Sequence, residues 1–234
     1  MDRSAELVIV GRLAGEQTPG MPIIELRNYQ MQPGRTREFI RYFEENFLFS
    51  QRDEGMDVLG QFEVVGEPDR FVWIRRFPDM ASRLRSLSAF YGGPYWQARR
   101  ETANSMIVDS DHVHLLRPVG SIDSLDGGRT LEDRAGEPPG VIAEDGGLIA
   151  VDFYRTKPGG LERVIEVFAG REVLGRFVTE TAANDFPGLP VIQEENLFVA
   201  ISACREGEAA LGIQGAEVER MVLRPTARSL IRGT

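Results

Sequence analysis

The amino-acid sequence predicts an α+β protein made of two copies of one βαββαβ module, the second of them shortened. Three observations support this prediction. Strand-like runs are followed by Pro-Gly and an amphipathic helix, the same order of short motifs occurs twice, and a stretch rich in Gly, Asp, Glu and Pro separates the copies. A chain of 234 residues can bury the cores of two small domains without disulfides.

Four pairs of motifs carry the duplication. They are IELRNYQMQPGRTREFIRYF (24–43) with IAVDFYRTKPGGLERVIEVF (149–168), VLGQF (58–62) with VLGRF (173–177), FVWI (71–74) with FVAI (198–201), and LLRP (115–118) with VLRP (222–225). Chance does not readily give four matches in one order, so we expect two modules of the same origin.

The first half of copy one follows from local rules. Residues 24–31 form a β-rich run that Pro33-Gly34 stops, with Pro33 as the helix-start residue. A helix face is then predicted by apolar residues at three- and four-residue spacing, namely Phe39, Ile40, Phe43 and Phe47. We expect this helix to end at Gly55.

The second half of copy one begins with a hairpin, in which strands 58–65 and 70–77 flank the turn residues 66–69. A second helix follows Pro78-Asp79, with the apolar residues Met80, Leu84, Leu87 and Phe90. Gly92-Gly93-Pro94 interrupts it, residues 95–106 resume a short helix, and residues 112–116 close the module as a strand.

Right-handed crossovers turn this order into a ferredoxin-like antiparallel sheet with helices on one face. Its other face needs a partner, and the second copy supplies a matching sheet. Copy two has too few residues between Cys204 and Glu217 for a second long helix. The expected organisation is a tail or edge strand at 1–21 with a β-like run at 7–10, a module at 22–118, a flexible linker at 119–147 and a degenerate module at 148–234.

Composition excludes several functional classes. The net charge of −9 disfavours nucleic acid and anionic membrane surfaces as partners. No apolar run reaches the ~20 residues that span a bilayer, and no export signal begins the chain, so we expect a cytoplasmic protein. A single cysteine, Cys204, allows neither an intrachain disulfide nor a cysteine zinc site. Nucleotide-binding, zinc-protease and serine-hydrolase motifs are missing from the sequence.

Three strings of copy one carry a family resemblance: IIELRNYQMQPGRTREF, RFVWIRRFPDMASR and FYGGPYWQARRETANSMIVDSDHVHLLRP. Residues 23–118 resemble the NIPSNAP family, and copy two does so weakly. The resemblance implies a dimeric α/β-barrel fold, shared by cofactor-free monooxygenases, aldoxime-acting enzymes and haem-binding enzymes. NIPSNAP proteins have no settled catalytic motif, so no residue roles carry over. Two modules in one chain can close the barrel internally, and a homodimer of such barrels stays possible.

The segment from Phe90 to Asn104 is the candidate mouth of a small-molecule pocket. Aromatic side chains offer flat apolar area, the glycines allow close backbone approach, and arginine can orient a carboxylate. The candidate ligand-binding residues are Trp73, Arg75, Phe90, Tyr91, Tyr95, Trp96, Arg100 and Asn104. Alternatively, the aromatic residues simply cap the core of the module and the glycines form a bend.

Other candidates lie on strands. Trp73 and Arg75 share one sheet face, and we favour packing against the other sheet over a place in the pocket. Tyr29, Tyr91 and His114 are the candidate acids or bases, with Arg75 or Arg100 to stabilise a developing anion. His112 and His114 also share a face, which suits a haem or a weak metal site, although structural histidines are favoured.

These observations favour a protein that binds a small organic molecule in a pocket with no metal and no cofactor, and that transforms this molecule if it is an enzyme. Whether it is an enzyme stays open. The rival hypothesis is a non-catalytic protein-interaction module, which predicts a filled core and an exposed apolar patch. A third alternative is a haem-binding enzyme that uses His112 or His114.

Overall fold

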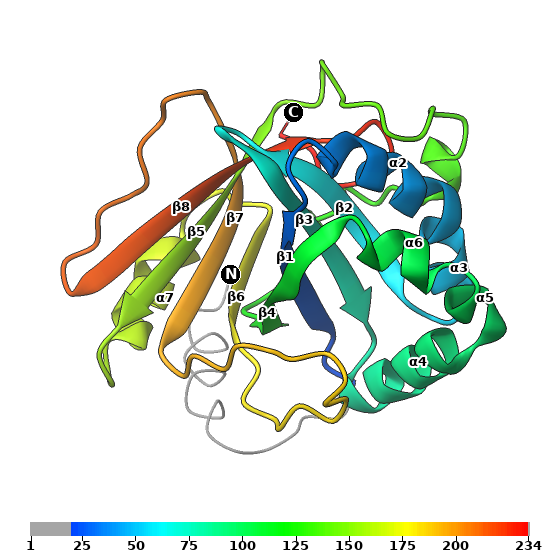
Figure 1. The fold of residues 1–234 in the computed structure, drawn as a ribbon. Coiled ribbons are helices and arrows are strands. Elements are labelled where there is room, and N and C mark those ends of the chain that lie inside the picture. Colours follow the sequence, from blue (N-terminus) through cyan, green and yellow to red (C-terminus); the bar gives the residue numbers. More distant parts are fainter. Residues whose placement is uncertain (1–19, 234) are drawn as a thin grey trace.

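The computed structural model describes residues 20–233 and shows a closed β-barrel flanked by helices (Figure 1). The first four strands are β1 (Ile23–Met31), β2 (Asp57–Val64), β3 (Glu67–Phe77) and β4 (Ile107–Pro118). The other four are β5 (Leu148–Thr156), β6 (Gly175–Thr179), β7 (Leu197–Cys204) and β8 (Ala216–Pro225). They follow the order β1-β3-β2-β8-β5-β7-β6-β4, and all neighbours are antiparallel.

Two sheets of identical topology make up this barrel. The first module has the order β2-β3-β1-β4, and the second repeats it as β6-β7-β5-β8. The sheets join where Phe62–Val64 of β2 meet β8 and where Leu116–Pro118 of β4 meet β6, through three residue pairs at each seam. The predicted fold class is therefore confirmed: a βαββαβ module and a shortened second module close one barrel inside a single chain.

Side chains from both sheets fill the barrel interior. Because alternate residues of a strand face opposite ways, Ile24 and Leu26 of β1 point inward while their neighbours point toward the helices. The interior includes the buried residues Ile24, Leu26, Phe62, Val72, Ile74, Leu116, Val151, Phe153, Phe177, Val199 and Leu223. This is the packing of one sheet face on the other that the bare faces of two modules require.

Five helices cover the outer face of the first sheet: α2 (Thr36–Asn46), α3 (Leu48–Asp53), α4 (Met80–Gly92), α5 (Pro94–Gln97) and α6 (Arg100–Asn104). They lie on the side of the barrel opposite to α7 (Figure 1). The predicted apolar face of α2 is correct, and its phenylalanines pack onto the sheet. Asp79 begins α4 because its carboxylate accepts a hydrogen bond from the Ser82 amide at 2.7 Å.

Three local predictions differ from the structure. The first helix begins at Thr36 rather than Pro33, because Gly34 adopts a φ of 73° in the intervening turn. Leu84 is 37% exposed, outside the apolar face of α4. The single helix expected at 95–106 is divided into α5 and α6, so the side chains between Tyr95 and Asn104 do not follow one helical face.

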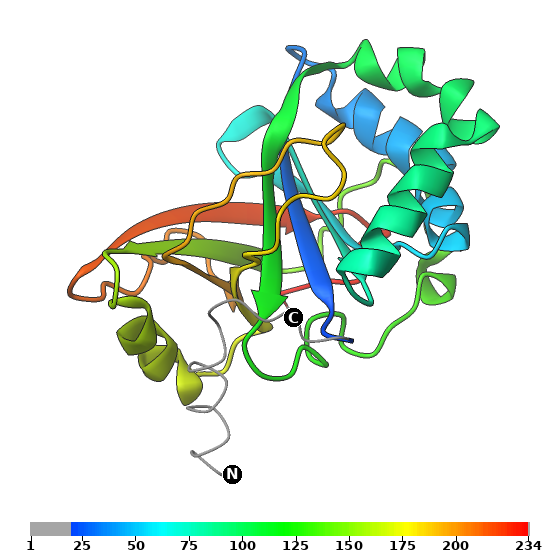
Figure 2. The same ribbon diagram turned by 90° about the horizontal axis from the view of Figure 1, so that it is seen from below.

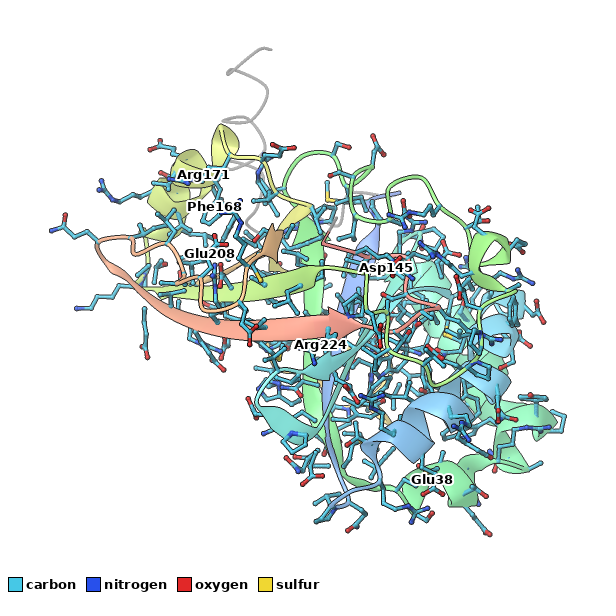
Figure 3. The ribbon with its side chains drawn as sticks, turned by 90° about the horizontal axis from the view of Figure 1, so that it is seen from above. Glu38, Asp145, Phe168, Arg171, Glu208 and Arg224 are labelled. Atoms are coloured by element: carbon cyan, nitrogen blue, oxygen red, sulfur yellow. The ribbon has the colours of Figure 1, made fainter. Side chains whose placement is uncertain are left out.

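The second module keeps one helix in the part of the chain that the structure describes, α7 (Leu161–Ala169). Phe168 lies on this helix (Figure 3). Its ring packs against that of Phe198 on β7, with the ring centroids 5.0 Å apart. Residues 205–215, where Glu208 lies, form an irregular connection from β7 to β8. The expected loss of the second helix is confirmed.

The connection between the modules was expected to be a flexible, exposed linker. In the structure, parts of it pack against the barrel. It contains the short 3-10 helix η1 (Glu132–Arg134). Leu125 and Leu131 are buried, and the amide of Gly140 donates to the Glu44 carboxylate at 2.7 Å. Apolar and hydrogen-bonding anchors thus hold a segment whose composition predicted a flexible linker. The expected tail or edge strand falls mostly on residues 1–19, outside the described part.

The repeated VLGxF motif has the same packing role in both modules. A Cβ on Gly60 would lie 2.6 Å from Cε2 of Phe62, and a Cβ on Gly175 would lie 2.6 Å from Cε2 of Phe177. Each glycine therefore makes room for a phenylalanine ring of the barrel interior. In both sheets the motif places this ring inside the barrel.

Gly60→Ala and Gly175→Ala should each lower the free energy of unfolding by about 1–3 kcal/mol, because the added methyl group displaces a buried ring. Urea unfolding monitored by circular dichroism measures the effect. Gly170→Ala is the matched control, since nothing lies within 4 Å of a Cβ built there. Two variants as stable as this control would show that the rings do not depend on the glycines.

Candidate functional site

Polar residues of β1 form a buried ionic cluster beneath the helices of the first module. Alternation places Glu25, Arg27 and Tyr29 on the face toward the helices, and Arg75 of β3 is the cross-strand partner of Glu25. Arg83 completes the cluster from α4, the helix that packs over the sheet. The side chains of the glutamate and the three arginines are at most 1% exposed.

The Glu25 carboxylate accepts hydrogen bonds from all three guanidinium groups. Arg75 Nη2 lies 2.6 Å from Oε1, Arg83 Nε lies 2.9 Å from Oε2, and Arg27 Nη1 also bonds Oε1. Burial by itself raises the pKa of Glu25, but the charges of Arg75, Arg27 and Arg83 outweigh burial and hold that pKa well below its usual range. Glu25 is therefore ionised wherever the protein is folded near neutral pH.

A cavity of about 80 Å³ lies next to this cluster, between the sheet and α2–α6. Arg27 and Tyr29 of β1 form part of its wall, with Gln51 of α3. Both tryptophans of the chain, Trp73 and Trp96, also line it. Its remaining lining is Phe39, Phe43, Phe47, Phe90, Tyr91, Ala103, Asn104, Ile107, Ser110 and Leu189. The cavity combines an aromatic wall with one buried cation.

Most of the predicted pocket residues meet at this cavity. Its lining contains the candidates Tyr29, Trp73, Phe90, Tyr91, Trp96 and Asn104. The preferred placement of Trp73 and Arg75 between the two sheets was wrong, because both lie on the helix face of β3. Arg75 does not line the cavity itself, but its Nη1 donates a hydrogen bond to Oε1 of Gln51, a lining residue, at 2.8 Å.

Besides Arg75, two predicted ligand-binding residues do not line the cavity. Tyr95 is 41% exposed and stacks against the Arg99 guanidinium, whose carbon lies 3.6 Å from the ring centroid. Arg100 is exposed at the start of α6. Sequence reasoning missed Arg27, although a charged residue between Glu25 and Tyr29 on one strand face was a visible signal.

Tyr29 has its hydroxyl oxygen fixed by the cluster. That oxygen accepts a hydrogen bond from Arg27 Nε at 2.8 Å, so the hydroxyl hydrogen remains available to another acceptor. Burial raises the pKa of Tyr29, while the charge of Arg27 opposes that shift. A protonated phenol at neutral pH is a hydrogen-bond or proton donor, and a poor base.

A loop of the second module covers this part of the first module. The chain between β6 and β7 extends across β4 toward the helices (Figures 1 and 2). Asp185 of this loop pairs with Arg83 at 2.9 Å, Phe186 packs on Tyr91 with ring centroids 6.0 Å apart, and Leu189 lines the cavity. The cavity therefore needs both modules to be complete.

The two histidines lie elsewhere, on the barrel-interior face of β4. Their ring centroids are 5.3 Å apart, and the His114 ring lies 5.3 Å from that of Phe153. Burial, with the nearby His112 and Arg155, lowers the pKa of His114 to about 4. Neither histidine lines the 80 Å³ cavity, and His114 is 1% exposed. His114 does not fit a haem, which needs an axial histidine facing an open space.

Residues 24–121 match the NIPSNAP family model. These residues make up the first module, which is similar to the NIPSNAP family and is called the NIPSNAP-type module below. An uncharacterized NIPSNAP-like domain protein from Burkholderia xenovorans is 24% identical, covering 41% of this chain and 84% of its own, with a TM-score of 0.38. A search of the curated proteins gave no match.

Two solved structures are similar along both modules. Proteins described provisionally as monooxygenases, from Lactobacillus acidophilus and Fusobacterium nucleatum, cover 88% and 89% of this chain and 94% of their own. Their identities are 14% and 9%, with TM-scores of 0.51 and 0.52. At such identity the likeness shows the fold alone, and it confirms that the NIPSNAP-type module and its shortened copy form one barrel.

Two further properties concern the part of the chain that the structure covers. Among residues 20–233, no helix is both long and apolar enough to cross a membrane. Within the same range, no three His, Cys, Asp or Glu side chains come together in a group that could hold a metal ion.

Asp185→Asn should loosen the loop over the NIPSNAP-type module, because the neutral amide attracts Arg83 less strongly. We expect acrylamide to quench tryptophan fluorescence at least twofold more efficiently than in the parent, since both tryptophans line the cavity beneath this loop. Asp123→Asn, at an exposed position between the modules, is the control. Equal quenching constants for all three proteins would contradict a closing role for Asp185.

His114 should make stability depend on pH. Its pKa is lower in the folded protein, about 4, than the 6.5 of an exposed histidine, so the unfolded chain binds more protons between these values. Stability therefore falls on acidification, by about 2 kcal/mol between pH 7 and pH 5. Urea unfolding at both pH values should show this difference in the parent and a much smaller one in His114→Leu. The same difference in both proteins would rule out His114 as its source.

Proposed function

We propose that the NIPSNAP-type module binds a small organic molecule in the cavity next to Arg27. The main support for this proposal is that aromatic side chains and the buried cation Arg27 line the same partly closed cavity. Binding sites for small molecules are commonly apolar hollows with a few polar groups that fix orientation. Here Arg27, Tyr29 and Gln51 supply those groups.

The rival hypothesis of a protein-interaction module has less support. It predicts a filled core and one exposed apolar patch. The large hydrophobic residues exposed in the described part are Leu84, Tyr95, Val108 and Val141, which come from α4, α5, β4 and the inter-module connection. Such scattered positions are ordinary for a protein surface, whereas the cavity lies where a pocket was predicted.

If the bound molecule reacts, Tyr29 is the best-placed proton donor. It lines the cavity, remains protonated because burial raises its pKa, and is oriented by Arg27. Tyr91 lies on the opposite, helix side of the same cavity. His114, the third candidate, faces the barrel interior and would take no part.

Filling the cavity tests the proposal. Ala103 is 1% exposed and lines the cavity, so Ala103→Leu adds three carbon atoms where a ligand would lie. Native mass spectrometry of gently purified protein should show a bound small molecule in the parent and little or none in this variant. Tryptophan emission during titration with benzoate, phenol and cyclohexanone gives the matching affinities, which should fall at least tenfold.

Arg100→Ala is the control, because it changes an exposed residue of the same short helix. It should bind like the parent. If Ala103→Leu folds and retains both the bound mass and the affinities of the parent, the cavity is not the binding site.

A further inference from the structure

The buried polar groups around the cavity also indicate the charge of its ligand. We infer that the cavity accepts a small organic anion, a carboxylate or an enolate, with its charged oxygen next to Arg27 and Tyr29. This inference rests on the proposed function and narrows it to one chemical class.

The first argument is the local charge balance. Arg27, Arg75 and Arg83 face two carboxylates, the buried Glu25 and the partly exposed Asp185 of the second-module loop. One positive charge therefore remains in excess among groups that have little or no contact with solvent. A buried charge without a counter-charge is strongly disfavoured, so an anion in the adjacent cavity would stabilise the cluster.

The second argument is the supply of hydrogen-bond donors. Arg27 uses three of its five N–H groups, on Tyr29, Glu25 and the Ser110 carbonyl, and keeps two. The Tyr29 hydroxyl accepts from Arg27 and keeps its own hydrogen. Gln51 accepts from Arg75 through Oε1, and its amide nitrogen makes no such bond. The indole N–H of Trp73, at 2% exposure, has no partner at all.

All four buried polar side chains of the lining therefore offer N–H or O–H groups. An unsatisfied buried donor is disfavoured, and an oxygen anion can accept several such bonds at once. An amide offers a weaker acceptor and brings its own donors, which would face Arg27. A cationic ligand would meet the excess positive charge directly.

The size of the cavity narrows the ligand further. A cavity of about 150 Å³ holds a benzene ring, and this one measures about 80 Å³. A short-chain carboxylate fits without rearrangement. A larger acid needs Tyr91 or Trp96, both only partly buried, to move outward.

Propanoate and propanamide form a matched pair of probes, since they share shape and differ in charge. At constant ionic strength, tryptophan emission and saturation-transfer NMR should show propanoate binding at least tenfold more tightly than propanamide. Tyr29→Phe should weaken propanoate about fivefold and leave propanamide nearly unchanged. Arg27→Gln should abolish the preference for propanoate over propanamide. If Arg27→Gln does not fold, Tyr29→Phe still decides the test.

The outcomes separate this inference from the proposed function. Propanamide binding as tightly as propanoate, with both blocked by Ala103→Leu, overturns the anionic ligand and leaves the pocket in place. Propanoate binding that neither Tyr29→Phe nor Ala103→Leu weakens places the anion elsewhere and overturns the inference. If none of propanoate, propanamide, benzoate, phenol and cyclohexanone binds, both the anion site and the pocket are wrong.

Discussion

A carboxylate without contact to solvent holds three guanidinium groups together where β1, β3 and α4 meet. Each arginine depends on Glu25, since an isolated guanidinium at the same depth would be far from water and without a counter-charge. Arg83 in turn connects α4 to the sheet, and Arg27 obtains its orientation toward Tyr29 and the cavity. The position of a helix, the shape of a cavity and the charge beside it thus follow from one buried anion.

The cluster also links the candidate site to barrel closure. Arg83 bonds Asp185, and that residue lies in the loop from β6, which pairs with β4, to β7, which pairs with β6. Backbone bonds hold both ends of this loop on β4, from the Glu180 amide to the Leu115 carbonyl and from the Ile192 amide to the Val113 carbonyl. The seam between β4 and β6 therefore positions the β6–β7 loop, whose Leu189 lines the cavity.

Much of the fold could be predicted from the sequence, because local patterns and the internal repeat agreed. The segment containing Phe90, Tyr91 and Trp96 was located for a sound physical reason, since aromatic side chains beside glycines favour a hollow. The facing of Trp73 could not be derived, because both faces of a barrel strand are buried here and alternation alone does not tell inside from outside.

Other parts of the site had no local signal. The contact of Asp185 with Arg83 joins residues about a hundred positions apart, and no sequence pattern near either residue predicts it. Tyr95 and Arg100 were misplaced because a break between α5 and α6 rotates the chain, and helical spacing does not extend across such a break. Arg27 was overlooked since a single arginine on a strand is usually a surface residue.

Joining both halves of the barrel in one polypeptide has an evolutionary consequence. In a barrel assembled from two identical subunits, every substitution occurs twice, so neither half can lose a helix without the other losing it too. Here the halves are encoded separately, and natural selection can act on each alone. Among the described residues, the second half has no counterpart of α4, and it contributes Asp185 and Leu189 to the surroundings of the cavity in the first. The two halves of the barrel therefore have different roles: the first contains the cavity, and the second closes the barrel and supplies the loop over that cavity.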